Sequence, residues 1–244
     1  MLSERNWKLE SVLRLLLGVF FCLCLGSLLT ILLRSAAHPN AGVSVGRIVV
    51  SALCFQLGVV ALVWRFLYEH KVTWVTGFGL RRDTLKALGL GAAAVGVFLP
   101  IGWGLQMLAL KVMAWLGLEP TVQLALQALK NSGSVVEIGA LALITILLAP
   151  IAEEALFRGV IYPTIKQYGF PRAALWGTSA LFAMIHFNVA IFVPLLLLAV
   201  VLVWLYERTD NLLAPIAAHA TFNAVNFAVF FLTEDFARTL PAQP

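Results

Sequence analysis

The sequence predicts an all-α, polytopic membrane helix bundle with about seven transmembrane helices and a cytoplasmic N-terminus. Its 244 residues are 61% hydrophobic and only 12% charged, whereas an average soluble domain carries about 25% charged residues. The charges are also unevenly spaced, so that long stretches contain no Asp, Glu, Lys or Arg. Only lipid or a very large core could hide such stretches, which argues against an ordinary water-soluble globule.

Uncharged runs define the expected spanning segments, because a helix needs about 20 apolar residues to cross a bilayer. The runs cover residues 15–33, 48–64, 87–110, 138–152, 173–206 and 211–233. The run 173–206 is long enough for two shorter helices, with a tight turn at 186–188. The short run 138–152 can continue to about Lys166 if its polar side chains face the protein interior. Together these segments give seven helices.

We expect one continuous membrane domain with three parts. They are N-terminal membrane helices and loops at 1–134, a helix core with the unusual polar residues at 135–233, and a polar tail at 234–244. Within the first part, residues 121–130 could form a short interfacial helix or an ordinary outer loop. The start of the chain resembles a signal peptide ending at 35–37, but its uncharged core of 19 residues exceeds the usual length of about 7 to 15. This mismatch favours a retained first helix.

The Lys and Arg residues flank the apolar runs, and their distribution predicts the orientation. With the N-terminus inside, twelve of the seventeen lie on the cytoplasmic side, as the positive-inside rule requires. The net charge of +5 suits contact with the anionic headgroups of membrane lipids. We expect no nucleic-acid partner, because the cations are not gathered on one face or along a groove. The three cysteines lie inside apolar runs, without the spacing of a zinc site or a redox pair.

Ionisable residues inside spanning segments mark candidate functional sites, since each costs roughly 2.5 to 3.5 kcal/mol on insertion scales. Three groups qualify: Glu153, Glu154 and Arg158 in the fourth predicted helix, His186 at the end of the fifth, and His219 with Asn223 in the seventh.

The first group can form an ion pair within one helix. Glu154 and Arg158 are four residues apart and share a helix face, in the favourable order of acid before base. Glu153 is rotated by about 100° around the helix, so it shares Arg158 less easily and is the freer carboxylate. A free carboxylate in this place is a candidate general base. The alternative is that all three residues form a structural polar knot between helices.

The histidines extend this hypothesis to other helices. His219 and Asn223 are also four residues apart and present an imidazole and a carboxamide on one face. If the bundle brings Glu153 and His186 to them, the carboxylate and the second imidazole could take a proton from water. His219 and Asn223 could then donate hydrogen bonds to a developing oxyanion. A lone histidine in an apolar helix is more often a packing residue, but two of them with a carboxylate pair weaken that interpretation.

Three spacings resemble the motifs of the CaaX-protease and bacteriocin-processing (CPBP, also called ABI) family of intramembrane proteases. They are Glu-Glu-x-x-x-Arg at 153–158, Phe-x-x-x-His at 182–186 and His-x-x-x-Asn at 219–223. The motifs occur in order on separate predicted helices, and Ala-Pro-Ile-Ala-Ala-His at 214–219 also looks like this family. The resemblance covers roughly residues 135–230.

The resemblance implies hydrolysis of a peptide bond inside the membrane, with 135–233 as the catalytic core. It assigns the roles as follows: Glu153 and His186 would activate water, His219 and Asn223 would stabilise the oxyanion, and Arg158 would hold Glu154. The implied partners are a peptide or protein substrate, including lipidated ones, and membrane lipids. We expect the protein in a bacterial cytoplasmic membrane.

The resemblance leaves the role of a metal open, since family members are described both as metalloproteases and as glutamate-based hydrolases. Glu153, His186 and His219 are candidate ligands for a divalent metal such as zinc. The familiar His-Glu-x-x-His pairing is absent, and Arg158 would partly repel a cation. We therefore expect no obligatory cofactor.

Two other classes of function remain as alternatives. A proton-coupled membrane transporter would also use Glu and His residues in its helices, but it would be expected to show internal repeats and matched Gly/Pro interruptions, which we do not find. A non-catalytic membrane scaffold or immunity protein is the other alternative.

Overall fold

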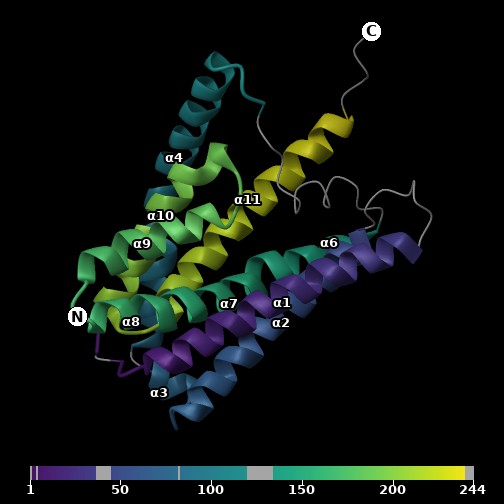
Figure 1. The fold of residues 1–244 in the computed structure, drawn as a ribbon. Helices are drawn as coiled ribbons and strands as arrows, with labels where there is room; N and C mark the ends of the chain where they lie inside the picture. Colours follow the sequence, from purple (N-terminus) through teal and green to yellow (C-terminus); the bar gives the residue numbers. More distant parts are fainter. Residues whose placement is uncertain (1, 4, 37–44, 82, 120–133, 240–244) are drawn as a thin grey trace.

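The computed structural model describes residues 2–3, 5–36, 45–81, 83–119 and 134–239, and every regular element in these ranges is a helix (Figure 1). The α-helices are α1 (Leu9–Ala36), α2 (Val45–Glu69), α3 (Trp74–Phe78), α4 (Thr84–Trp115), α6 (Val135–Leu143), α7 (Ala149–Leu156), α8 (Tyr162–Gln167), α9 (Pro171–Met184), α10 (Val189–Thr209) and α11 (Leu213–Thr239). Two π-helical segments, η1 (Ile144–Leu148) and η2 (Phe157–Ile161), join α6, α7 and α8 into one long helix. The predicted all-α bundle is confirmed.

Six helices in the described ranges are long and apolar enough to cross a membrane, and the chain is an integral membrane protein. The number is six rather than about seven because α9 has only 14 residues. At 1.5 Å per residue such a helix is about 21 Å long, shorter than the hydrocarbon core of about 30 Å. The run 173–206 does divide into two helices, and the turn between them lies at the predicted place, after Met184 and before Val189.

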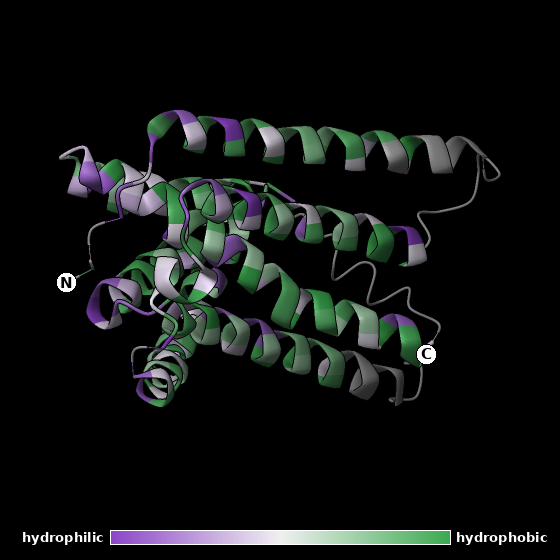
Figure 2. Ribbon diagram, turned by 90° about the horizontal axis from the view of Figure 1, so that it is seen from below, coloured by the Kyte–Doolittle hydropathy of each residue, from purple (hydrophilic) through white to green (hydrophobic). Residues whose placement is uncertain are grey.

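Hydrophilic residues are concentrated at the end of the bundle where the N-terminus lies, called the polar end below (Figure 2). The N-terminal segment is bound there to helices far away in the sequence. Arg5 Nη2 lies 2.7 Å from Asp210 Oδ1, and Trp7 Nε1 donates a hydrogen bond of 2.9 Å to the carbonyl of Gly159. The polar end thus forms a single polar layer. It is the end that the positive-inside rule predicts to be cytoplasmic, and its orientation in the membrane stays a prediction.

The helices form a bundle around one main hydrophobic core, in which α4 packs against α10 and α11, and α2 packs against α1 and α7. The contact between α4 and α11 depends on Gly91, since a Cβ atom there would lie 2.3 Å from the carbonyl oxygen of Ala214. This close approach fixes the first turns of α11, which carry His219.

One predicted boundary differs from the structure, and one predicted segment cannot be compared with it. Helix α11 ends at Thr239, so the segment predicted as a polar tail from 234 onward begins inside the helix. The segment 121–130, predicted as an interfacial helix or an outer loop, lies outside the described residues.

Candidate active site

The predicted carboxylates lie on a helix that is interrupted twice. Segments η1 and η2 flank α7, and each is followed within two residues by a proline, Pro150 and Pro163. Proline has no N–H to donate within a helix, and π-helical turns are frequent at functional sites. Glu153 and Glu154 therefore sit on a short α-helical stretch between two irregular turns.

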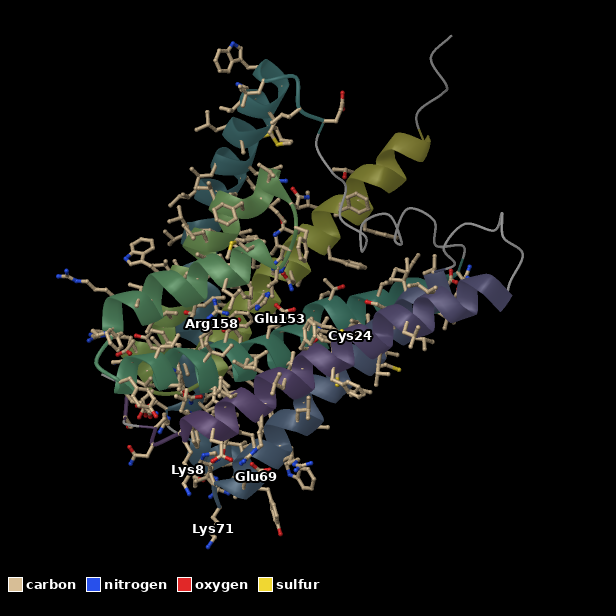
Figure 3. All side chains as sticks on the ribbon, in the orientation of Figure 1. Lys8, Cys24, Glu69, Lys71, Glu153 and Arg158 are labelled. Atoms are coloured by element: carbon tan, nitrogen blue, oxygen red, sulfur yellow. The ribbon has the colours of Figure 1, made fainter. Side chains whose placement is uncertain are left out.

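Glu154 and Arg158 form the predicted ion pair, and both side chains are buried. Arg158 Nη1 lies 3.0 Å from Glu154 Oε1, and the two side chains are 1% and 0% exposed. Arg158 Nη2 also donates a hydrogen bond of 3.3 Å to the carbonyl of Ala199 on α10. Figure 3 shows Arg158 and Glu153 inside the bundle, away from the lysines at the polar end. The guanidinium thus links two helices and compensates a buried carboxylate, which would be costly alone.

His219 of α11 joins this pair through its Nδ1 atom, which lies 2.8 Å from Glu154 Oε1. A carboxylate oxygen only accepts, so Nδ1 carries the proton of this hydrogen bond. The other ring nitrogen, Nε2, lies 3.9 Å from Glu153 Oε2. Glu154 therefore orients the imidazole, in the way a carboxylate fixes a histidine in metal and acyl-transfer sites.

Glu153 is the freer carboxylate, as predicted. Its side chain is 21% exposed, and its Oε2 atom is buried without a hydrogen-bond partner among the described residues. Among those residues its one ionic contact is the 3.9 Å approach of His219 Nε2. The structure thus separates the two neighbouring carboxylates: Glu154 is held by Arg158 and His219, and Glu153 is not.

His186 contacts the ring of Phe182, which also contacts His219. The ring of Phe182 is 5.0 Å from that of His186 and 5.6 Å from that of His219, measured between centroids. His186 Nδ1 lies 2.7 Å from the carbonyl of Phe182, so Nδ1 carries a proton and Nε2 is the acceptor nitrogen of the neutral ring. Within the described part of the chain, no hydrogen bond or ion pair joins His186 to Glu153 or His219.

Phe182 is the side chain around which the site is packed, and its role was not evident from the motif spacing. It is fully buried, and the Arg158 guanidinium carbon lies 4.5 Å from its ring centroid. Such a distance allows a cation–π interaction. The phenylalanine of the Phe-x-x-x-His motif thus touches the cation and both histidines.

Asn223, the other predicted oxyanion donor, is bonded to the interrupted helix. Its Nδ2 donates a hydrogen bond of 2.8 Å to the carbonyl of Thr145 in η1. This carbonyl lacks a backbone donor: the N–H of Ala149 bonds to Ile144 instead, and the next residue, Pro150, has no N–H. One of the two Nδ2 hydrogens is therefore committed to the helix interruption, and an oxyanion role would rest on the other.

The replacement Asn223→Ala is expected to lower the free energy of unfolding by about 1–3 kcal/mol, the cost of a buried acceptor without a donor. Pro150→Ala supplies a new backbone N–H to this turn, so the loss on Asn223→Ala should shrink in the Pro150→Ala background. Unfolding of the two single variants and the double variant in detergent measures this coupling. If Asn223→Ala lowers the free energy of unfolding equally in the wild-type and the Pro150→Ala backgrounds, the role of Asn223 as the donor to this carbonyl is contradicted.

At the second helix interruption, η2, a side chain far away in the sequence also donates to a carbonyl that a proline leaves free. The sequence did not predict this contact. The carbonyl of Gly159 would accept from residue 163 in a regular α-helix, but Pro163 has no N–H. Trp7 Nε1 donates to this carbonyl instead. The two prolines were the available signal, because a proline inside a membrane helix frees a carbonyl that another group must satisfy.

The candidate metal ligands do not form a ligand set in this structure. In the described ranges, no three His, Cys, Asp or Glu side chains are grouped so that they could hold one ion. His219 Nδ1 and Glu154 are committed to each other, and Arg158 lies against them. Of the two ring nitrogens of His219, only Nε2 is therefore left to bind an ion in this arrangement.

Comparison with known proteins shows that the segment that carries this site is similar to a known family. Residues 136–225, which include all six predicted site residues, match the family model described as type II CAAX prenyl endopeptidase Rce1-like. The UPF0177 protein YxdF of Lactococcus lactis subsp. lactis (strain IL1403) is 27% identical over 96 residues, which cover 39% of this chain and 52% of that protein. The uncharacterized protein YpbD of Bacillus subtilis (strain 168) is 36% identical over 83 residues, which cover 32% of this chain and 40% of that protein.

These matches span about half of the first relative's length and less than half of the second's. No solved structure matches the chain. The matched segment nevertheless agrees with the resemblance inferred from the three motifs. Residues 136–225 are thus similar to the Rce1-like family, which supports the resemblance to the CPBP family.

Proposed function

We propose that the chain is an intramembrane endopeptidase of the CAAX-protease type, with Glu153 as the residue that activates water. The observation that carries this proposal is the unequal use of the two carboxylates. Glu154 is bonded through Oε1 to Arg158 and His219, whereas Glu153 has only the 3.9 Å approach of His219 among the described residues; the Oε2 atom of each is buried without a hydrogen-bond partner there. Glu153 is therefore the carboxylate of the two that is left to accept a proton from water.

His219 is the proposed oxyanion donor, through the ring nitrogen Nε2 that faces Glu153. Nδ1 donates to Glu154, so donation from Nε2 as well requires the imidazolium form of the ring. In that form the ring, two carboxylates and one guanidinium together carry no net charge, and Nε2 can donate to an oxyanion formed beside Glu153.

The reaction then follows from these positions. Glu153 takes a proton from water while the water oxygen attacks the carbonyl carbon of the peptide. The carbonyl oxygen becomes an oxyanion that accepts a hydrogen bond from His219 Nε2. The proton on Glu153 passes to the leaving nitrogen as the C–N bond breaks, which restores the carboxylate. His186 supports the water through its acceptor nitrogen Nε2.

The substrate class and the membrane are part of the proposal. A protease requires a peptide or protein substrate, and the description of the matching family as prenyl endopeptidases favours substrates with a lipid on a cysteine near the cleaved bond. The two relatives come from bacteria, which supports a bacterial cytoplasmic membrane.

A cleavage assay with the purified chain and matched prenylated and unprenylated peptides tests the proposal. We expect His186→Ala to lower the cleavage rate by about 10²–10⁴-fold, the usual contribution of a proton-transfer group. His70→Ala is the matched control, because His70 stacks on Phe66 and bonds to its carbonyl as His186 does with Phe182. Unchanged cleavage by His186→Ala would refute its role. A chelator arm tests for a metal: activity lost to chelator and restored by zinc would show that one is required.

A further inference from the structure

A pocket of about 420 Å³ at the polar end is lined by charged, polar and apolar groups and shares no lining residue with the proposed active site. It lies between the N-terminal segment, α3 with the turn that follows it, and the turn between α10 and α11. The lining residues that matter here are Ser3, Arg5, Gly79, Arg81 and Asp210. A volume of this size is within the range of sites for small ligands, about 300–1,000 Å³.

The walls of the pocket are held by close backbone contacts. Gly79 has a φ angle of 69°, and a Cβ atom there would lie 1.9 Å from the carbonyl oxygen of Asp210. The adjacent residue, Phe78, accepts a hydrogen bond of 3.0 Å from the backbone N–H of Leu212. The turn after α3 is therefore docked on the turn between α10 and α11, and the pocket is a built feature of the fold.

The charges in the pocket leave an excess of guanidinium groups. Arg5 Nη2 lies 2.7 Å from Asp210 Oδ1, and Ser3 donates two further hydrogen bonds to the same carboxylate. The Arg5 side chain is 10% exposed, and its Nε atom is buried without a hydrogen-bond partner in the described part of the chain. Arg81 is exposed on the pocket wall and makes no ion pair with any described residue. Among the described lining residues, two arginines and one aspartate thus leave one positive charge in excess.

Exposed aromatic side chains place this end of the bundle at the level of the lipid headgroups. Tyr68 at the end of α2 is 77% exposed, Tyr168 after α8 is 52% exposed, and Trp176 near the start of α9 is 52% exposed. Tyr and Trp are enriched at this depth of the bilayer, where the lipid phosphates lie. Guanidinium groups bind phosphate oxygens through paired hydrogen bonds.

We propose that this pocket binds the phosphate of an anionic lipid headgroup, with Arg81 as the main donor and Arg5 as the second. The proposal is independent of the peptidase activity, because the pocket and the catalytic cluster have no residue in common. It also holds for either orientation of the chain in the membrane.

The test measures lipid binding to the purified full chain in neutral detergent, by native mass spectrometry and by the thermal unfolding midpoint. We expect phosphatidylglycerol to bind more tightly than phosphatidylcholine, which carries a cation beside its phosphate. Arg81→Gln should weaken phosphatidylglycerol binding about 10- to 100-fold, as for the loss of hydrogen bonds to a charged group. Arg172→Gln, which removes another exposed cation at the polar end outside the pocket, should leave binding unchanged.

The outcomes distinguish binding in this pocket from a general electrostatic attraction of anionic lipids to the protein surface. Equal weakening by Arg81→Gln and Arg172→Gln, or no preference for phosphatidylglycerol, would overturn the proposal. Inorganic phosphate serves as a further probe: competition with phosphatidylglycerol that depends on Arg81 supports recognition of the phosphate group. Binding of inorganic phosphate without binding of the lipid would overturn the lipid as its source.

Discussion

Replacing Arg158 by methionine is expected to lower the free energy of unfolding by about 3–5 kcal/mol, because Glu154 would keep a buried charge without its partner. Both side chains are at most 1% exposed, so water cannot take the place of the guanidinium. The change also removes the hydrogen bond to Ala199 and the contact with the Phe182 ring. Peptide cleavage should be lost together with stability, since the same cation holds the helices that carry the site.

A surface pair of the same spacing provides the control. Glu10 and Arg14 are also four residues apart and ion-paired, but their side chains are 82% and 53% exposed. Arg14→Met should therefore cost about 0.5 kcal/mol or less. Unfolding of Arg158→Met and Arg14→Met in detergent compares a buried with an exposed Glu–Arg pair. Equal losses in the free energy of unfolding would show that burial does not determine how much the Arg158 pair stabilises the fold.

A double variant separates stability from catalysis. In Glu154→Gln/Arg158→Met no uncompensated charge remains on this pair, and the Gln carbonyl can still accept from His219 Nδ1. Most of the lost stability should return, since neutral replacements of buried ion pairs are tolerated far better than removal of one partner. Cleavage should not return, because the proposed oxyanion donor His219 would face a neutral amide in place of the Glu154 carboxylate.

The sequence predicted those parts of the site that follow from helical periodicity. The pair of Glu154 with Arg158 and the freer state of Glu153 follow from spacings of four residues and one residue on a single helix. The early turn at 186–188 also follows from local signals, and α9 does end at Met184. The contact of His219 with Glu154 could not be predicted in this way, because it joins residues 65 positions apart and depends on how closely α11 approaches α7.

The Phe-x-x-x-His spacing shows why a local pattern cannot identify a site. It occurs at Phe66–His70 as well as at Phe182–His186, with a ring contact and a hydrogen bond from Nδ1 to the phenylalanine carbonyl in both places. At the polar end, His70 Nε2 accepts a hydrogen bond from a backbone N–H, so both ring nitrogens are used. The second pair differs because Phe182 packs against Arg158 and His219, which is a property of the tertiary fold.

Glu153→Gln is expected to lower the rate of peptide cleavage by about 10²–10⁴-fold without a loss of stability. The amide has nearly the same shape as the carboxylate but cannot take a proton from water at neutral pH. Folding should be preserved because Glu153 Oε2 has no hydrogen-bond partner to lose among the described residues.

The neighbouring change Glu154→Gln distinguishes a catalytic carboxylate from a structural one. It leaves the buried guanidinium of Arg158 without its counterion, so both stability and cleavage should fall. Cleavage rates and unfolding midpoints of the two variants, measured on the same preparations, should therefore differ in pattern: activity alone for Glu153, activity and stability for Glu154. If Glu153→Gln cleaves peptides at the wild-type rate, water must be activated by another group, and the unequal use of the two carboxylates serves only to position His219.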